Sequence, residues 1–127
     1  MKLTAWTTLA CLLMYIWIFA KVGLARKKFG INAPETQGPV AFLSVLRVQA
    51  NTVEQLVLFL PALWMCAYFL NDQFSALTGL VWVAGRIIYA LGYYQAPEKR
   101  SIGFGIASLS TMVLIAGTVA GLTHVLA

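Results

Sequence analysis

Charged and amide side chains stand at helical spacing inside an apolar stretch of this sequence. Arg47, Asn51 and Glu54 are separated by four and then three residues, so they share one face of a helix. An arginine in the middle of a membrane span costs roughly 2.5–3.5 kcal/mol on insertion scales. Such residues usually face the interior of a helix bundle and mark a functional site. The spacing therefore predicts a polar helix face that meets a ligand.

A second polar face follows in the next apolar stretch. Arg86, Tyr89 and Tyr93 are separated by three and then four residues, and Arg100 and Ser101 open the stretch after that. Because consecutive spans run in opposite directions, the start of one span lies at the same membrane depth as the end of the next. We therefore expect all of these groups in one layer of a helix bundle.

The charges in this layer indicate the kind of ligand. Arg47, Arg86 and Arg100 supply three positive charges and Glu54 supplies one negative charge, which leaves a surplus of two. Such a surplus is unfavourable in a low dielectric unless an anion accompanies it. Arginine forks suit carboxylates or phosphates, and one acidic side chain suits an ammonium group. A small peptide-like anion with two carboxylates and one amine fits this balance.

Each of these residues also has a plainer interpretation. Arg47 and Arg100 lie near span ends, where basic side chains reach the interface, and Glu54 could be the counter-ion of an arginine. Asn51 could join helices and Ser101 could cap one, while the two tyrosines could simply pack. The agreement of depth and helix face favours a binding site over these separate roles.

The composition places the supporting elements in lipid. The chain has 127 residues, of which 61% are hydrophobic and 10% are charged, and its mean hydropathy is +0.82. Soluble proteins have about 45–50% apolar and about 25% charged residues, and a small domain cannot bury so much apolar surface. This excludes a soluble monomer, a disordered chain and a disulfide scaffold. With one histidine, we expect no metal site of the zinc type.

Four runs of residues are long and apolar enough to cross a bilayer as helices. They cover about 3–20, 47–70, 74–94 and 102–126, and they predict an all-α integral membrane protein whose single domain, 1–127, is a four-helix bundle. The segment 21–46 is expected to be a loop, because it holds a basic cluster and turn-forming residues. Pro61 is expected to kink the second span.

Basic residues predict the orientation in the membrane. The first and third loops with their edges hold Lys21, Arg26, Lys27, Lys28, Arg47, Lys99 and Arg100. The other side holds Lys2. The positive-inside rule therefore places loops one and three in the cytoplasm and both termini outside. The short first loop favours a bacterial inner membrane, and a location in the endoplasmic reticulum stays open.

Three of these segments together resemble the MAPEG family, the membrane-associated proteins of eicosanoid and glutathione metabolism. The stretch Arg47–Glu54 is similar to the family's R-x-x-x-N-x-x-E signature, Gly85–Tyr93 to its third helix, and Lys99–Phe104 to the start of its fourth helix. The loop residues 32–35 after a basic cluster are also similar. The resemblance covers about residues 20–105 and keeps the order and spacing of the motifs.

The resemblance implies a homotrimer of four-helix subunits with glutathione bound between neighbours. The implied glutathione contacts are Arg47, Asn51, Glu54, Tyr89, Tyr93 and Arg100. Gln49 and Arg26 would reach the site of an adjacent subunit, and Arg86 would support the site from the third helix. Arg100 would stabilise the glutathione thiolate, and Ser101 is the second candidate for this role.

The activity implied by the resemblance is that of a glutathione transferase or peroxidase acting on an apolar electrophile or a lipid hydroperoxide. Phe104 stands where some members have a tyrosine, and Gln55 replaces an aromatic residue of some members. A non-catalytic member that binds glutathione or lipid is therefore an alternative. A small multidrug-resistance-like exporter is more remote, because the first span has no carboxylate and arginines accompany Glu54.

Overall fold

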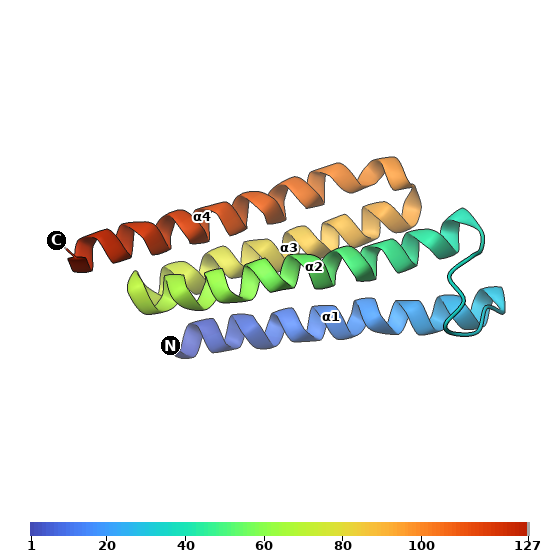
Figure 1. Ribbon diagram of the computed structural model, residues 1–127, viewed down its shortest axis with the longest axis horizontal. Helices are drawn as coiled ribbons and strands as arrows, with labels where there is room; N and C mark the ends of the chain where they lie inside the picture. Colours follow the sequence, from blue (N-terminus) through green and yellow to red (C-terminus); the bar gives the residue numbers. More distant parts are fainter. Residues whose placement is uncertain (127) are drawn as a thin grey trace.

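The computed structural model describes residues 1–126 and the side chains as far as His124. Its four long helices are α1 (Lys2–Phe29), α2 (Val40–Phe69), α3 (Asp72–Gln95) and α4 (Ser101–Leu126), with a 3₁₀ helix η1 (Pro97–Arg100) before α4. They run alternately up and down a bundle that contains no strand over the described residues (Figure 1). The predicted all-helical membrane fold is confirmed, since all four helices are long and apolar enough to cross a bilayer.

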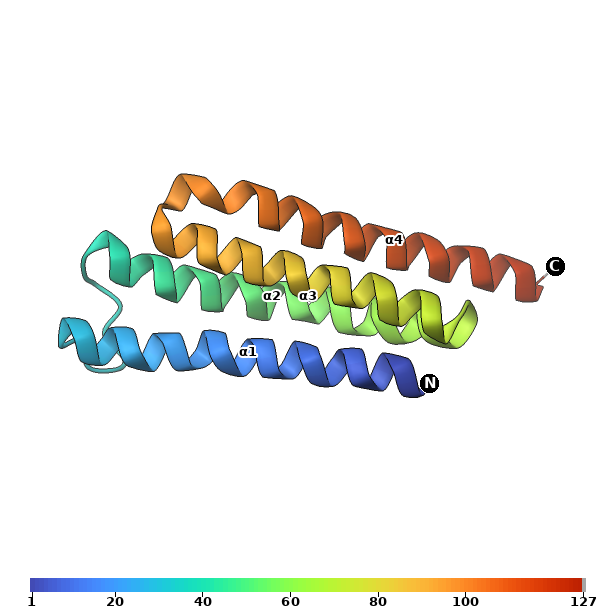
Figure 2. The ribbon, with the colours of Figure 1, turned by 180° about the vertical axis from the view of Figure 1, so that it is seen from behind.

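The central pair of the bundle is α2 and α3. The helix α3 contacts each of the other three helices, and α1 and α4 lie at opposite edges in both views (Figures 1 and 2). Phe59 of α2 and Trp82 of α3 stack in this centre with ring centroids 3.8 Å apart and an interplanar angle of 4°. Both side chains are fully buried, so this aromatic pair joins the two central helices.

The first two helices extend beyond the apolar runs that mark them. The segment 21–46, predicted to be a loop, is mostly helical, because α1 continues to Phe29 and α2 already begins at Val40. Hydropathy reports only the part of a helix in lipid, whereas the ends here are set by local signals. Gly30 ends α1 in the left-handed conformation, with φ 66°, and three basic residues occupy the last turn, where they complement the helix dipole. Pro39 precedes α2, which stays one helix through Pro61.

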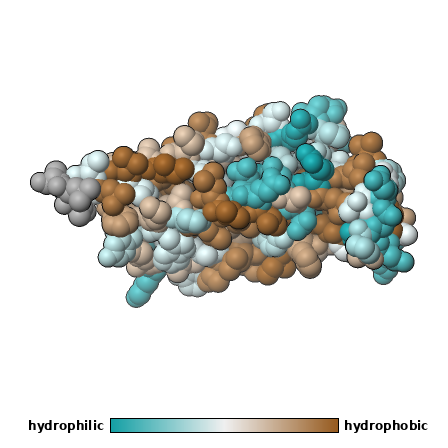
Figure 3. All heavy atoms as spheres, viewed as in Figure 1, coloured by the Kyte–Doolittle hydropathy of each residue, from teal (hydrophilic) through white to brown (hydrophobic). Residues whose placement is uncertain are grey.

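The surface of the bundle is apolar along its length. Large hydrophobic side chains such as Val57, Trp6 and Ile102 are 74%, 69% and 73% exposed. The space-filling view shows brown apolar atoms over the body and more teal atoms toward the end that carries the loop 30–39 and η1 (Figure 3). This distribution suits a bundle that is surrounded by lipid and reaches water at that end.

The helices α3 and α4 approach most closely near this polar end. A Cβ atom added to Gly103 would lie against the backbone nitrogen of Tyr89 and 2.6 Å from the carbonyl oxygen of Gly85. Only a residue without a side chain therefore permits this approach. It holds η1 and the first turn of α4 against the part of α3 that carries Tyr89.

Candidate functional site

A cavity of about 260 Å³ opens where α2, α3, η1 and α4 meet. Its lining residues are Arg47, Asn51, Tyr89, Tyr93, Arg100 and Phe104. Five of these six are predicted site residues from three separate segments of the chain, and the structure brings them together. We call this space the arginine cavity.

Arg100 holds a defined position at the edge of the arginine cavity. Its Nη1 donates to the carbonyl oxygen of Pro97 at 2.7 Å, within η1. The guanidinium carbon lies 5.8 Å from the ring centroid of Tyr93, and that ring meets the ring of Tyr89 edge-on at 5.7 Å. The backbone bond and the aromatic ring together orient a side chain that is otherwise exposed.

Arg86 lies behind the arginine cavity rather than in its lining. The side chain is 0% exposed, and its Nη2 donates to Oδ1 of Asn51 at 2.8 Å and to Oγ1 of Thr52 at 2.7 Å. Because the Asn51 oxygen accepts from Arg86, the NH₂ of that amide is left to donate to a ligand. Arg86 thus acts on the cavity by orienting Asn51.

The guanidinium of Arg86 also supplies positive charge to this layer. Its carbon is 4.1 Å from the ring centroid of Tyr89, a distance at which a cation is attracted to the ring face. Its Nε and Nη1 are buried and have no hydrogen-bond partner among the described residues. The ring of Tyr89 and two neutral oxygens therefore surround this charge.

Thr52 is a supporting residue that the sequence patterns did not single out. It is fully buried, accepts from Arg86, and donates its own hydroxyl proton to the carbonyl oxygen of Val48 at 2.7 Å. Its hydroxyl in an apolar run, directly after Asn51, was the available signal. A threonine in a helix commonly bonds its own backbone, so a hydroxyl at this position does not by itself indicate a supporting role.

Three further predicted site residues, Gln49, Arg26 and Glu54, lie away from the arginine cavity. The side chain of Gln49 donates to the hydroxyl of Tyr15 on α1 at 2.9 Å. Arg26 donates to the carbonyl oxygens of Glu35, at 2.8 Å, and Ile31, at 3.4 Å, and so holds the loop 30–39. Glu54 is exposed on α2 and does not line the arginine cavity. Contacts from Gln49 and Arg26 to a neighbouring subunit stay a prediction.

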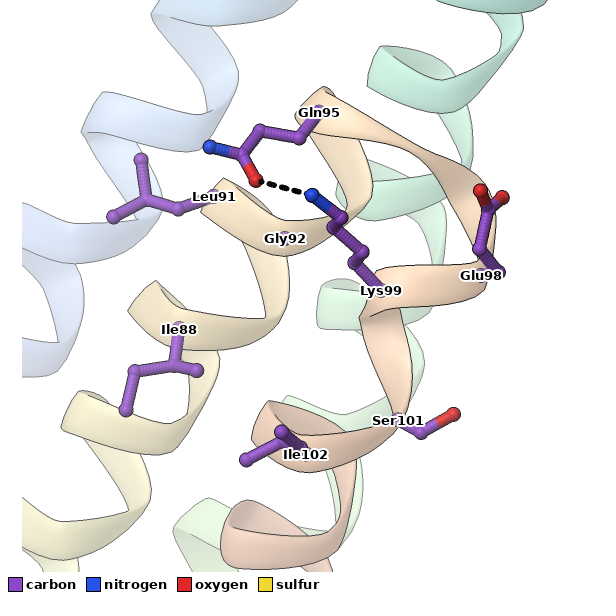
Figure 4. Close-up of a pocket in the computed structure, with 8 residues that line it drawn as sticks. All are labelled: Ile88, Leu91, Gly92, Gln95, Glu98, Lys99, Ser101 and Ile102. Atoms are coloured by element: carbon purple, nitrogen blue, oxygen red, sulfur yellow. Dashed lines mark hydrogen bonds between the residues drawn. The ribbon is translucent and has the colours of Figure 1, made fainter.

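Ser101 lines a different cavity of about 530 Å³, beside the turn between α3 and α4. Figure 4 shows its hydroxyl pointing away from Ile88 and Leu91, which lie across this space. Lys99 donates to the side-chain oxygen of Gln95 at its rim, at 3.3 Å. Arg100 and Ser101 are adjacent in sequence yet line separate cavities.

The arginine cavity carries the predicted surplus of two positive charges, although from a different set of residues. Arg47 and Arg100 line it, and its described lining contains no carboxylate. Arg86 and Glu54, whose opposite charges were part of the predicted sum, lie outside the lining. An arrangement of two guanidiniums, an amide and two phenols suits a ligand with carboxylate groups.

The sequence matches the MAPEG family over residues 3–120. An uncharacterized protein of Synechocystis sp. is 50% identical over 111 residues, which cover 87% of this chain and 80% of that protein.

Two relatives carry names that state a reaction. Microsomal glutathione S-transferase 2 of Homo sapiens is 38% identical over 97 residues, which span 73% of this chain and 66% of that protein. Leukotriene C4 synthase of Bos taurus is 32% identical over 120 residues, which span 94% of this chain and 80% of that protein. With a family match over nearly its whole length and four apolar helices, this chain belongs to the MAPEG family of membrane proteins.

Proposed function

We propose that this protein binds glutathione in the arginine cavity and activates its thiol, as a membrane-bound transferase or peroxidase. The observation that carries the proposal is the meeting of Arg47, Arg100 and the Asn51 amide in one cavity whose described lining has no carboxylate. Relatives named as a glutathione S-transferase and a leukotriene C4 synthase support the same class of reaction.

The chemistry of glutathione suits the residues of the cavity. Its two carboxylates are partners for the guanidinium forks of Arg47 and Arg100, and bidentate pairs of this kind fix orientation as well as adding affinity. The NH₂ of Asn51 and the hydroxyls of Tyr89 and Tyr93 add neutral hydrogen bonds. In the homotrimer that we propose, Gln49 and Arg26 of a neighbour would complete the cavity and Glu54 would accept from the ligand's amine.

Thiol activation is the task we assign to Arg100. The free thiol has a pKa of about 8.5, so only a few per cent is thiolate at neutral pH. Lowering that pKa by about 2 units requires roughly 2.7 kcal/mol of preferential stabilisation of the anion. A guanidinium beside the sulfur can supply this amount once the bound ligand and the neighbouring subunit of the proposed homotrimer exclude bulk water from Arg100.

Two reactions follow from an activated thiolate, and both begin with release of the thiol proton to solvent. In transfer, the sulfur forms a bond to an electrophilic carbon and the leaving group departs with the electron pair. In reduction, the sulfur attacks the terminal hydroperoxide oxygen, the O–O bond breaks, and the alkoxide leaves and takes a proton from solvent to become the alcohol. A second glutathione then converts the resulting sulfenic acid to a disulfide and water. We assign the apolar electrophile to the separate cavity lined by Ser101, whose walls include Ile88, Leu91 and Ile102.

The binding step is tested by calorimetric titration of the detergent-purified protein with glutathione. Arg47→Ala is expected to weaken the affinity by about tenfold or more, because a hydrogen bond to a charged group contributes about 1.5–3 kcal/mol. Lys27→Ala removes an equal charge from the exposed last turn of α1 and is the matched control, expected to bind normally. Unchanged affinity in Arg47→Ala would place the ligand outside the arginine cavity.

The chemical step is tested by two assays on the same preparation. Conjugation of 1-chloro-2,4-dinitrobenzene reports transfer, and oxidation of glutathione by cumene hydroperoxide reports reduction. Saturable binding with neither activity would identify a non-catalytic member of the family. Absence of binding as well as activity would contradict the proposal.

We also propose a bacterial inner-membrane location with both termini outside and loops one and three in the cytoplasm. The unequal division of basic residues between the two ends supports this orientation. A cysteine introduced at Lys28 should react with a membrane-impermeant maleimide only after spheroplasts are lysed. Labelling in intact spheroplasts would show that the protein has the opposite orientation.

A further inference from the structure

A second cationic cavity lies between α1, α2 and α3 at the same end of the bundle, with a volume of about 270 Å³. Lys21 and Lys28 come from α1 and Tyr94 from α3, while Leu24, Phe29 and Val45 are among its apolar walls. It shares no lining residue with the arginine cavity. We call it the lysine cavity.

The polar groups of the lysine cavity are donors without matching acceptors. The Nζ atom of Lys21 lies 5.9 Å from the ring centroid of Trp17 and 6.0 Å from that of Tyr94, so the ammonium lies beside both rings. The hydroxyl of Tyr94 is buried and has no hydrogen-bond partner in the described part of the chain. Its described lining includes no acidic side chain. Buried hydroxyls normally have partners, which indicates that an acceptor belongs here.

The depth of Lys21 in the membrane indicates which kind of molecule supplies this acceptor. A helix rises about 1.5 Å per residue, so about 20 residues cross the hydrocarbon layer of about 30 Å. Since α1 begins at Lys2, Lys21 reaches the boundary at which lipid phosphates lie. Lysines that merely reach the interface place their ammonium in water, whereas this one stands over two rings at the mouth of a cavity.

We propose that the lysine cavity binds the phosphate of an anionic phospholipid headgroup. Lys21 and Lys28 would pair with the phosphate, and the Tyr94 hydroxyl would donate to one of its oxygens. The apolar walls favour a lipid over free phosphate, because they can cover the glycerol and upper acyl groups. Basic pockets between membrane helices are recurrent sites for anionic headgroups.

The test measures lipid adducts of the full-length purified protein by native mass spectrometry during titration with phosphatidylglycerol. Lys21→Ala and Lys28→Ala are each expected to weaken the affinity by about fivefold, the contribution of one lysine near an anionic lipid surface. Tyr94→Phe keeps the ring and should weaken it by about threefold. Lys27→Ala, which removes the same charge from outside the lining, should bind like the unaltered protein.

Three results would overturn the proposal. An equal loss in Lys27→Ala would mean that net charge alone attracts the lipid. Equal adducts with phosphatidylcholine would mean that the negative headgroup is not recognised. Full competition by inorganic phosphate at concentrations matching the lipid would assign the cavity to free phosphate. Far-ultraviolet circular dichroism of each variant checks that the helices remain, and glutathione titration, which does not involve this cavity, should stay unchanged.

Discussion

The two ends of the bundle use polar residues to opposite effect. At the end where α1 and α3 begin, Asp72 accepts from the backbone nitrogen of Thr4 at 3.0 Å, from its hydroxyl at 2.6 Å, and from the backbone nitrogen of Leu3 at 3.1 Å. Thr7 likewise donates to the carbonyl oxygen of Ala76 at 2.9 Å. Donors and acceptors are matched there, and they join α1 to α3.

At the other end, donors outnumber acceptors. Arg86 keeps two buried nitrogens without partners and Tyr94 keeps a buried hydroxyl without one, within the part of the chain that the structure describes. Arg47 and Arg100 line a cavity without a carboxylate in its described lining. At the first end the polar residues satisfy one another and are structural, whereas the unmatched donors beside the two cationic cavities indicate a ligand.

The largest effect on stability and binding is expected from substitutions at two glycines where helices touch. A Cβ on Gly103 would collide with the backbone of Tyr89, and one on Gly121 would collide with the carbonyl group of Phe69. Gly103→Ala and Gly121→Ala should each destabilise the detergent-solubilised protein by about 1–3 kcal/mol, the usual cost of overpacking. Only Gly103→Ala should also abolish glutathione binding, because it moves α4 and η1 away from α3.

Thermal unfolding and calorimetry of the two alanine variants decide between these effects. Loss of binding in Gly121→Ala, in protein that retains its helix content, would show that the ends are not independent. Retained binding in Gly103→Ala would show that the close approach does not position the arginine cavity.

An intermediate effect is expected when Asn51 loses its orienting partner. Arg86→Leu removes the donor to Oδ1 of Asn51 and to Thr52. We expect glutathione affinity to fall by about tenfold, about 1.4 kcal/mol, since the amide is then free to rotate away from the ligand. Calorimetry at neutral pH measures the change, and Arg86→Lys should recover part of it. An unaltered affinity in Arg86→Leu would make Arg86 a packing residue only.

The smallest effect on stability is expected at the end of the bundle where α1 and α3 begin. Thr4→Val keeps the shape of the buried side chain but removes the hydroxyl that donates to Asp72. The loss should be about 1 kcal/mol of stability, the net contribution of one hydrogen bond, with no change in glutathione affinity. Chemical denaturation and calorimetry on one preparation measure both quantities. A change in affinity would mean that α1 transmits strain from one end to the other.

Much of the fold could be predicted from hydropathy, because lipid requires long apolar helices. The four apolar spans follow from the sequence, and Asn71 caps α3 by accepting from the backbone nitrogen of Phe74 at 2.8 Å. The end of α1 and the start of α2 could not be predicted from hydropathy, since a helix that continues into water carries no hydropathy signal. Gly30 and Pro39 are the local signals that place those ends.

Part of the candidate site could also be predicted, because depth and helical spacing group residues by layer. Arg47, Asn51 and Tyr93 indeed lie together. Spacing does not fix the rotation of one helix against its neighbours, which side-chain packing determines. For this reason Gln49 points to α1 and Ser101 lines the neighbouring cavity.

The role that we propose for Arg100 is to stabilise a thiolate through its unmatched positive charge. Ultraviolet difference absorbance of the purified protein with added glutathione, at neutral pH, observes the thiolate directly. We predict a saturable thiolate band in the unaltered protein and in Lys99→Ala, whose side chain bonds Gln95 outside the arginine cavity. Arg100→Ala should retain measurable glutathione binding and lose the band. A band of full amplitude in Arg100→Ala would contradict this role of Arg100.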